Sequence, residues 1–316
     1  MRLLLLIALF GKTPESLTEI KSFGSNPGNL SLFVHAPSPF KDSTQYPLVI
    51  VLHGCNQNAS IISEESGWNT LADRYGFIVA YPQQSMLNNA QRCFNWFLKS
   101  DNSIDQGEML SLHEMIKYCT KNYPIKTSSV FIYGLSAGAF MSVAYMANYP
   151  EDIQAGVSCA GGPFGAANSI SEVMRLAGKP MDHSQNEWLS ILHQKAGMHA
   201  RYPKLIILQG SKDQVVHPQY AIELMEQWTA LHHTDANADS LHTTFENNPH
   251  LQKSEYRDSN NAWCVLLYQW EGLGHALPVN PGKGIRQGGK SGWFTVDKDF
   301  FSTWYIARNL GLIPNH

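Results

Sequence analysis

The chain has 316 residues, of which 43% are hydrophobic and 16% are charged, and these proportions exclude a disordered protein. A single large α/β domain of this length is common, so we expect residues 13–316 to form one domain. The net charge of -3 and a pI near 6.5 exclude a strong attraction for nucleic acid.

The N-terminus begins with Met1 and Arg2, followed by the apolar stretch Leu3–Phe10, which has the charge and core of a secretory signal peptide. The stretch is too short to span a bilayer, so we predict no membrane span. No small-x-small cleavage pattern follows it, which leaves an N-terminal strand or a misassigned start as alternatives. Residues 1–12 are interpreted as a possible signal peptide, with an extracellular or periplasmic location.

Two segments near the N-terminus, Leu17–Phe23 and Leu30–His35, predict an antiparallel hairpin at one sheet edge, joined through residues 25–28. Six apolar runs then predict strands that are buried on both faces of a sheet. They are Leu48–Leu52, Phe77–Ala80, Val130–Tyr133, Ala155–Cys159, Leu205–Leu208 and Cys264–Trp270. Helical patterns alternate with these runs, which is typical of a mostly parallel, doubly wound α/β sheet.

Among the helical patterns, Asp105–Tyr118 has apolar residues at helical spacing and predicts a crossover helix with Asp105 as its capping residue. Residues 162–200 predict a helical cap insertion over the sheet. Its helices are expected at Ser169–Leu176 and Gln185–Gln194.

Two segments remain near the C-terminus. The polar segment Thr234–Asn261 is rich in Asn, Asp and His, and it predicts a long surface loop. A terminal helix is expected around Val296–Asn309. No linker or repeat marks a second domain.

The most specific motif is residues 134–138, which read Gly-Leu-Ser-Ala-Gly between the predicted strand Val130–Tyr133 and an apolar helix that stops at Pro150. Such a strand-to-helix turn exposes a serine hydroxyl above the sheet, and its glycines permit the crowded backbone. A serine becomes a strong nucleophile when a base takes its proton. Ser136 is the candidate nucleophile, and an ordinary Gly-Ser turn is the alternative.

An acid and a histidine are expected after this serine, in that order. Asp213 follows a predicted strand and can orient an imidazole, although it can also cap the helix that begins near Pro218. His275 lies in a Gly-rich turn after the last strand and is the candidate base. His217 is the competitor, but it lies four residues after Asp213 and breaks the expected order.

Two main-chain N–H groups are expected to hold the negative charge that develops on a substrate oxygen. One is that of Ala137, and the other is that of Cys55, in the loop after Leu48–Leu52. The chain has no C-x-x-C pair and no H-E-x-x-H motif, so we predict no metal site and no redox dithiol. Five cysteines leave at least one thiol unpaired within the chain.

These motifs together resemble the polyhydroxybutyrate depolymerase family of esterases, in the α/β-hydrolase superfamily, which also contains feruloyl and acetyl xylan esterases. The likeness runs from Pro47 to His275. The matching segments are 52–55 (L-H-G-C), 67–69 (G-W-N), 81–83 (Y-P-Q), 93–97 (C-F-N-W-F), 134–138 (G-L-S-A-G) and 272–276 (G-L-G-H-A). The resemblance implies a secreted serine ester hydrolase that needs no cofactor, with Ser136, Asp213 and His275 as its triad.

The resemblance also assigns residues of the segment 93–97. Trp96 matches a tryptophan that lines the substrate site, with a core aromatic as the alternative. Cys55 and Cys93 both fall in matched motifs, which implies a disulfide between them. Phe94 stands where the family usually has Trp, which leaves the substrate preference open. Cys119 lies on an apolar helix face, and we expect it to be a buried thiol.

The implied reaction is hydrolysis through an acyl-enzyme, on poly- or oligo-hydroxybutyrate esters or similar short-acyl esters. A feruloyl or acetyl xylan esterase would use the same triad and is one alternative. A hydrolase-fold protein that binds a partner without catalysis is another. No module for adsorption to a polymer is visible after His275, so oligomers or small esters are the expected partners. The sequence does not predict the oligomeric state.

Overall fold

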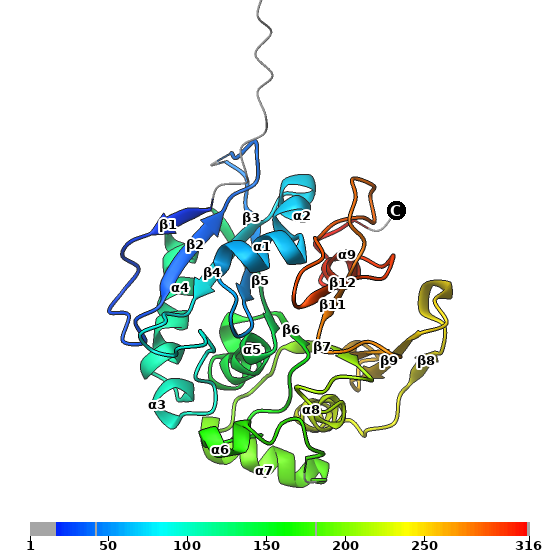
Figure 1. Ribbon diagram of the computed structural model, residues 1–316. Helices are drawn as coiled ribbons and strands as arrows, with labels where there is room; N and C mark the ends of the chain where they lie inside the picture. Colours follow the sequence, from blue (N-terminus) through cyan, green and yellow to red (C-terminus); the bar gives the residue numbers. More distant parts are fainter. Residues whose placement is uncertain (1–16, 42, 181, 315–316) are drawn as a thin grey trace, which may run out of the picture.

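The computed structural model describes residues 17–41, 43–180 and 182–314, so the predicted signal peptide lies outside the described residues. Its centre is a ten-stranded sheet in the order β1-β2-β4-β3-β5-β6-β7-β10-β9-β8 (Figure 1). The strands are β1 Thr18–Ile20, β2 Ser31–His35, β3 Tyr46–Leu52, β4 Ile78–Gln83, β5 Ile125–Leu135, β6 Ala155–Cys159, β7 Lys204–Gly210, β8 Ser240–His242, β9 Leu251–Arg257 and β10 Trp263–Trp270. The six central strands are parallel, and antiparallel strands extend both edges. A separate parallel pair, β11 Leu277–Val279 and β12 Thr295–Asp297, follows β10.

Helices cover both faces of the sheet, as a doubly wound fold requires. They are α1 Ala59–Ser66, α2 Trp68–Tyr75, α3 Lys99–Asn102, α4 Gly107–Asn122, α5 Ala137–Asn148, α6 Ile170–Val173, α7 Gln185–Ala196, α8 Gln219–Leu231 and α9 Ser302–Asn309. One apolar core contains α4, α5 and α8, and a second core on the opposite face contains α1, α2 and α9. In the described part of the chain, every helix is too short or too polar to cross a membrane.

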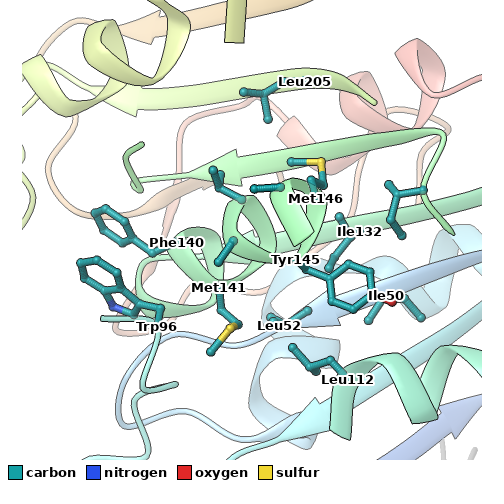
Figure 2. Close-up of a cluster of buried hydrophobic side chains, with 14 of the residues drawn as sticks. Ile50, Leu52, Trp96, Leu112, Ile132, Phe140, Met141, Tyr145, Met146 and Leu205 are labelled. Atoms are coloured by element: carbon teal, nitrogen blue, oxygen red, sulfur yellow. The ribbon is translucent and has the colours of Figure 1, made fainter. Parts of the chain in front are cut away.

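Strand β3 shows why its sequence is a continuous apolar run. Leu48, Ile50 and Leu52 belong to the core with α5, whereas Val49 and Val51 belong to the core on the opposite face. Successive side chains of a strand point to opposite faces, so both faces here must be apolar. Figure 2 shows Ile50 and Leu52 grouped with side chains of α5.

All six predicted central strands are confirmed, and Ala155–Cys159 matches β6 at both ends. The predicted helix Gln185–Gln194 is confirmed as α7, which begins with a capping box at Ser184. The other insertion helix, α6, is shorter than predicted. The terminal helix begins later than predicted, because residues 295–297 form β12.

The N-terminal hairpin is confirmed, but its first strand ends at Ile20 rather than at Phe23. The following segment leaves the sheet to contact α4. The main-chain N–H groups of Ser25 and Asn26 donate to the carboxylate of Glu114, at 2.8 and 2.7 Å. These bonds replace the hydrogen bonds that a longer strand would make.

The predicted cap of the crossover helix is wrong. Helix α4 begins at Gly107, and Asp105 has a positive φ of 58° outside it. The carboxylate of Asp105 accepts from the hydroxyl of Tyr149 at 2.9 Å. Asp101 accepts from the main-chain N–H of Glu108 instead, at 3.2 Å. The helix therefore takes its cap from a residue six positions before its start.

The prediction of a surface loop over Thr234–Asn261 is also wrong, because β8 and β9 extend the sheet there. Strand β9 pairs antiparallel with β10 and buries Leu251 and Tyr256. Lys253 is buried too, and its ammonium lies 2.6 Å from the carboxylate of Glu255. Pairing of opposite charges lets polar residues occupy this strand.

Candidate active site

Ser136 lies on the sharp turn between β5 and α5, with φ 56° and ψ -120°. Its flanking glycines leave no room for side chains. A Cβ on Gly134 would lie 2.1 Å from the carbonyl oxygen of Gly138, and a Cβ on Gly138 would lie 2.4 Å from that of Leu52. Close approach of α5 to β3 thus holds the serine in a strained backbone conformation.

His275 and Asp213, which are distant in sequence, meet at Ser136. The Nε2 atom of His275 lies 2.9 Å from the Oγ atom of Ser136, and its Nδ1 atom lies 2.8 Å from the Oδ2 atom of Asp213. The carboxylate can only accept, so it holds the proton on Nδ1 and leaves Nε2 to accept from the serine hydroxyl. This arrangement can remove the serine proton.

Asp213 is 4% exposed and is held by further donors. Its Oδ1 atom accepts from the main-chain N–H groups of Val215 and Val216, each at 2.9 Å, and its Oδ2 atom accepts from Gln209. Burial raises the pKa of this carboxyl, but the hydrogen bond and charge of His275, with the two N–H groups, outweigh it and lower the pKa overall. Asp213 is therefore held as a carboxylate beside the imidazole.

The loop that carries Cys55 lies directly against Ser136. A Cβ on Gly54 would lie 3.4 Å from the Cβ atom of Ser136. The main-chain N–H of Cys55 donates to no acceptor among the described residues. Ala137 is the first residue of α5, where a main-chain N–H has no partner within the helix. Cys55 and Ala137 both line the same cavity as Ser136.

His53 orients the peptide group that carries the Cys55 N–H. The main-chain N–H of Gln84 donates to its Nε2 atom at 3.1 Å, so Nε2 must be unprotonated. Its Nδ1–H then donates to the carbonyl oxygen of Gly54 at 2.7 Å. In a trans peptide, this carbonyl and the N–H of Cys55 point in opposite directions. Nothing in its sequence context pointed to this role.

We expect His53 to make the protein sensitive to acid. Burial lowers the pKa of His53 from 6.5 to about 4, so the unfolded chain takes up this proton at a higher pH than the folded chain. The stability is complete above pH 6.5 and falls as the pH drops toward 4, by on the order of 3 kcal/mol. Urea unfolding at pH 7, 5.5 and 4 should show a steeper loss for the wild type than for His53→Asn. His250→Asn, at an exposed position, should keep the wild-type slope, and parallel curves for all three proteins would contradict the expectation.

The disulfide between Cys55 and Cys93 is present, with a Cα–Cα distance of 4.3 Å. It ties the Cys55 loop to the segment 93–97. Trp96 is 5% exposed, and its ring stacks on that of Phe140 at a centroid distance of 4.0 Å (Figure 2). Trp96 thus lines the cavity and belongs to the core at once. Cys119 is a buried free thiol, as expected.

Phe94 does not line the cavity. It is fully buried, and its ring centroid lies 5.0 Å from that of His53. The change from Trp to Phe at this position therefore affects the support of the Cys55 loop.

The cavity at Ser136 has a volume of about 460 Å³. Apart from the candidate triad, its walls are mostly apolar and come from β-strand ends, α5, the insertion and the loop before β12. The larger apolar side chains in the lining are those of Trp96, Phe140, Val173, Met174, Leu176, Val215, Val216 and Phe294. Among the described residues that line it, none has a Lys, Arg, Asp or Glu side chain. An uncharged ligand fits such a lining.

The competitor histidine has a structural role. The Nδ1 atom of His217 accepts from the main-chain N–H of Gln219 at the start of α8, at 3.2 Å. Within the described residues, no cluster of three or more His, Cys, Asp or Glu side chains is arranged to hold a metal ion.

Solved structures of esterases share this architecture. The chain is similar to an acetyl xylan esterase from Aspergillus awamori, with a TM-score of 0.73 and 22% identity over 82% of this chain and 94% of that one. It is also similar to esterase 2 of Thermogutta terrifontis, with a TM-score of 0.54 and 11% identity over 96% and 98% of the two chains. The protein has the α/β-hydrolase fold.

Sequence comparisons define the family more closely. A family model described as Esterase PHB depolymerase matches residues 31–244. Poly(3-hydroxyalkanoate) depolymerase C of Paucimonas lemoignei is 36% identical over 310 residues, which are 98% of this chain and 73% of that protein. Feruloyl esterase B of Talaromyces funiculosus is 26% identical over 84% of this chain and 74% of that protein. The chain belongs to the esterase PHB depolymerase family and is a carboxylic ester hydrolase.

Proposed function

We propose that the chain hydrolyses esters through an acyl-enzyme on Ser136. The serine Oγ atom attacks the ester carbonyl carbon while its proton passes to Nε2 of His275. The N–H groups of Cys55 and Ala137 bind the oxyanion that forms. His275 then protonates the alcohol, which leaves, and the acyl group stays on Ser136. Water takes the place of the alcohol, His275 removes a proton from this water as it attacks the acyl carbonyl, and the acid is released with Ser136 protonated again. The hydrogen bonds that link Ser136, His275 and Asp213 carry this proposal.

We further propose that the substrates are poly- or oligo-3-hydroxyalkanoate esters, or similar short-acyl esters. Support comes from the 36% identity to poly(3-hydroxyalkanoate) depolymerase C and from the uncharged, apolar cavity. The disulfide is typical of oxidising compartments, which supports an extracellular or periplasmic location. A feruloyl or acetyl xylan esterase is the second candidate, because feruloyl esterase B is 26% identical to the chain.

A substrate panel distinguishes these candidates. We expect kcat/KM for a 3-hydroxybutyrate trimer to exceed that for methyl ferulate by about tenfold or more, since the chain is 36% identical to poly(3-hydroxyalkanoate) depolymerase C but 26% identical to feruloyl esterase B. Acetylated xylan is the third substrate. A higher kcat/KM for methyl ferulate or for acetylated xylan would favour the second candidate.

A separate experiment tests the alternative that the chain binds a partner and does not catalyse a reaction. A fluorophosphonate probe should label the wild type at Ser136 and should not label Ser136→Ala. If the wild type stays unlabelled and hydrolyses none of the three substrates, the catalytic proposal is wrong.

A further inference from the structure

Glu108 is a buried carboxyl that the proposed reaction does not use. It is the second residue of α4 and is 1% exposed. Burial raises the pKa of Glu108 to about 8, against hydrogen bonds from Asn95 and Gln84 that lower it. A buried carboxyl group needs hydrogen-bond donors for its oxygens. We therefore look for the role of Glu108 in the residues that donate hydrogen bonds to it, Gln84 and Asn95.

Three donors converge on the Glu108 carboxyl group. The main-chain N–H and the side-chain amide of Asn95 donate to it at 2.9 and 2.8 Å, and the side-chain amide of Gln84 donates at 2.5 Å. Both amides are oriented by further bonds. The Oε1 atom of Gln84 accepts from Ser85, and the Oδ1 atom of Asn95 accepts from Asn89. Both oxygens of the Glu108 carboxyl group accept hydrogen bonds here, so an amide in its place would turn an N–H toward at least one donor.

One line of hydrogen bonds runs from Glu108 through Gln84 to the Cys55 N–H. The main chain of Gln84 holds His53, and His53 holds the carbonyl oxygen of Gly54. That carbonyl shares its peptide group with the Cys55 N–H. Hydrogen bonding to a carbonyl also polarises the N–H of the same peptide group.

A second line runs from Glu108 through Asn95 and reaches the same loop covalently. Asn95 lies between Trp96, which lines the cavity, and the chain segment that leads to Cys93. Cys93 is bonded to Cys55, and its carbonyl oxygen accepts from Gln84 at 3.2 Å. Both lines therefore end at the Cys55 loop, and Glu108 is their common origin.

We propose that Glu108 is a positioning residue for ester hydrolysis, which fixes the Cys55 N–H for the oxyanion and holds Trp96 in the cavity wall. This inference rests on the proposed function. The oxyanion exists only after attack on the carbonyl, so loss of Glu108 should slow the reaction more than it weakens ground-state binding.

The test is Glu108→Gln, which keeps the shape of the side chain but turns an N–H toward at least one donor. Loss of one oxyanion donor costs about 100- to 1000-fold in kcat, and a displaced donor should cost less. We expect kcat for p-nitrophenyl butyrate to fall about 10- to 100-fold, with KM within about threefold of the wild type. The Ki of butylboronic acid, which mimics the tetrahedral intermediate on Ser136, should rise by the same factor as kcat/KM falls.

Glu223→Gln is the matched control. Glu223 is also fully buried, and it accepts from the indole of Trp188 at 2.6 Å and from Gln219 at 3.1 Å, away from the Cys55 loop. This variant should lose a similar amount in Tm but keep kcat within about twofold. Equal losses of kcat in the two variants, or a loss of Glu108→Gln that lies entirely in KM, would overturn the inference.

Gln84→Met decides the question if Glu108→Gln does not fold. It removes one donor to Glu108 and keeps the main-chain N–H that holds His53, so kcat should fall about three- to tenfold at constant KM. An unchanged kcat would overturn the inference. Failure of the proposed function would be visible separately, because the wild type itself would then resist the fluorophosphonate probe.

Discussion

Ser136→Ala should reduce kcat for p-nitrophenyl butyrate by about 10⁴- to 10⁶-fold, because it removes the hydroxyl that is proposed to form the acyl-enzyme. Within the described residues, the Oγ atom of Ser136 has one hydrogen-bond partner, His275, and the side chain borders a cavity. Its removal therefore leaves no buried donor or acceptor without access to water. The Tm should stay within a few degrees of the wild-type value.

The matched control is Ser142→Ala, in α5, the helix that follows Ser136. The Ser142 hydroxyl is buried and donates to the carbonyl oxygen of Gly138 at 2.8 Å. Its loss should lower the Tm and leave kcat nearly unchanged. Turnover by Ser136→Ala above about 1% of the wild-type value, measured on protein free of contaminating esterase, would contradict the assignment of the nucleophile.

Asp213→Asn should reduce kcat by about 10⁴-fold while the fold is retained. With its oxygen bound to the N–H groups of Val215 and Val216, the new amide would point its N–H toward His275. The imidazole would then have to accept at Nδ1 and carry its proton on Nε2, where it cannot take the proton of Ser136. The measurement is kcat for p-nitrophenyl butyrate across pH 6–9.

Asp152→Asn is the control for this variant, because the chain has a second pair of the same kind. The Nδ1 atom of His113 lies 2.8 Å from the Oδ2 atom of Asp152, on the α4 and α5 side and apart from the cavity. This substitution should change stability only. A loss below about tenfold for Asp213→Asn would show that the carboxylate does not set the imidazole tautomer.

The predicted strands and the residues at their ends could be read from the sequence because local patterns determine them. A continuous apolar run, such as Ala155–Cys159, is required wherever both faces of a strand are buried, and the run ends where the strand does. Asp213 and His275 were placed by the same logic, since parallel strands end at one edge of the sheet. The glycines around Ser136 reflect a close backbone contact that no other residue allows.

Predictions failed where a segment depends on a partner far along the chain. Strand β9 looks polar because its Lys253 and Glu255 neutralise each other in the sheet. Asp105 looked like a helix cap, but Tyr149 binds its carboxylate. In each case the residue type fits both a solvent-exposed or local role and a contact with a distant segment, so the sequence does not distinguish the two.

The sequence by itself determined the central sheet, the serine turn and the order of Ser136, Asp213 and His275, because these depend on periodicity, steric limits and chain order. The tertiary structure alone decided how the Cys55 loop is held. The tautomer of His53, the orientation of the Gly54 carbonyl and the burial of Glu108 depend on hydrogen bonds between segments that are distant in sequence. Such bonds leave no periodic pattern, since each partner is an ordinary polar residue until the fold brings the two together.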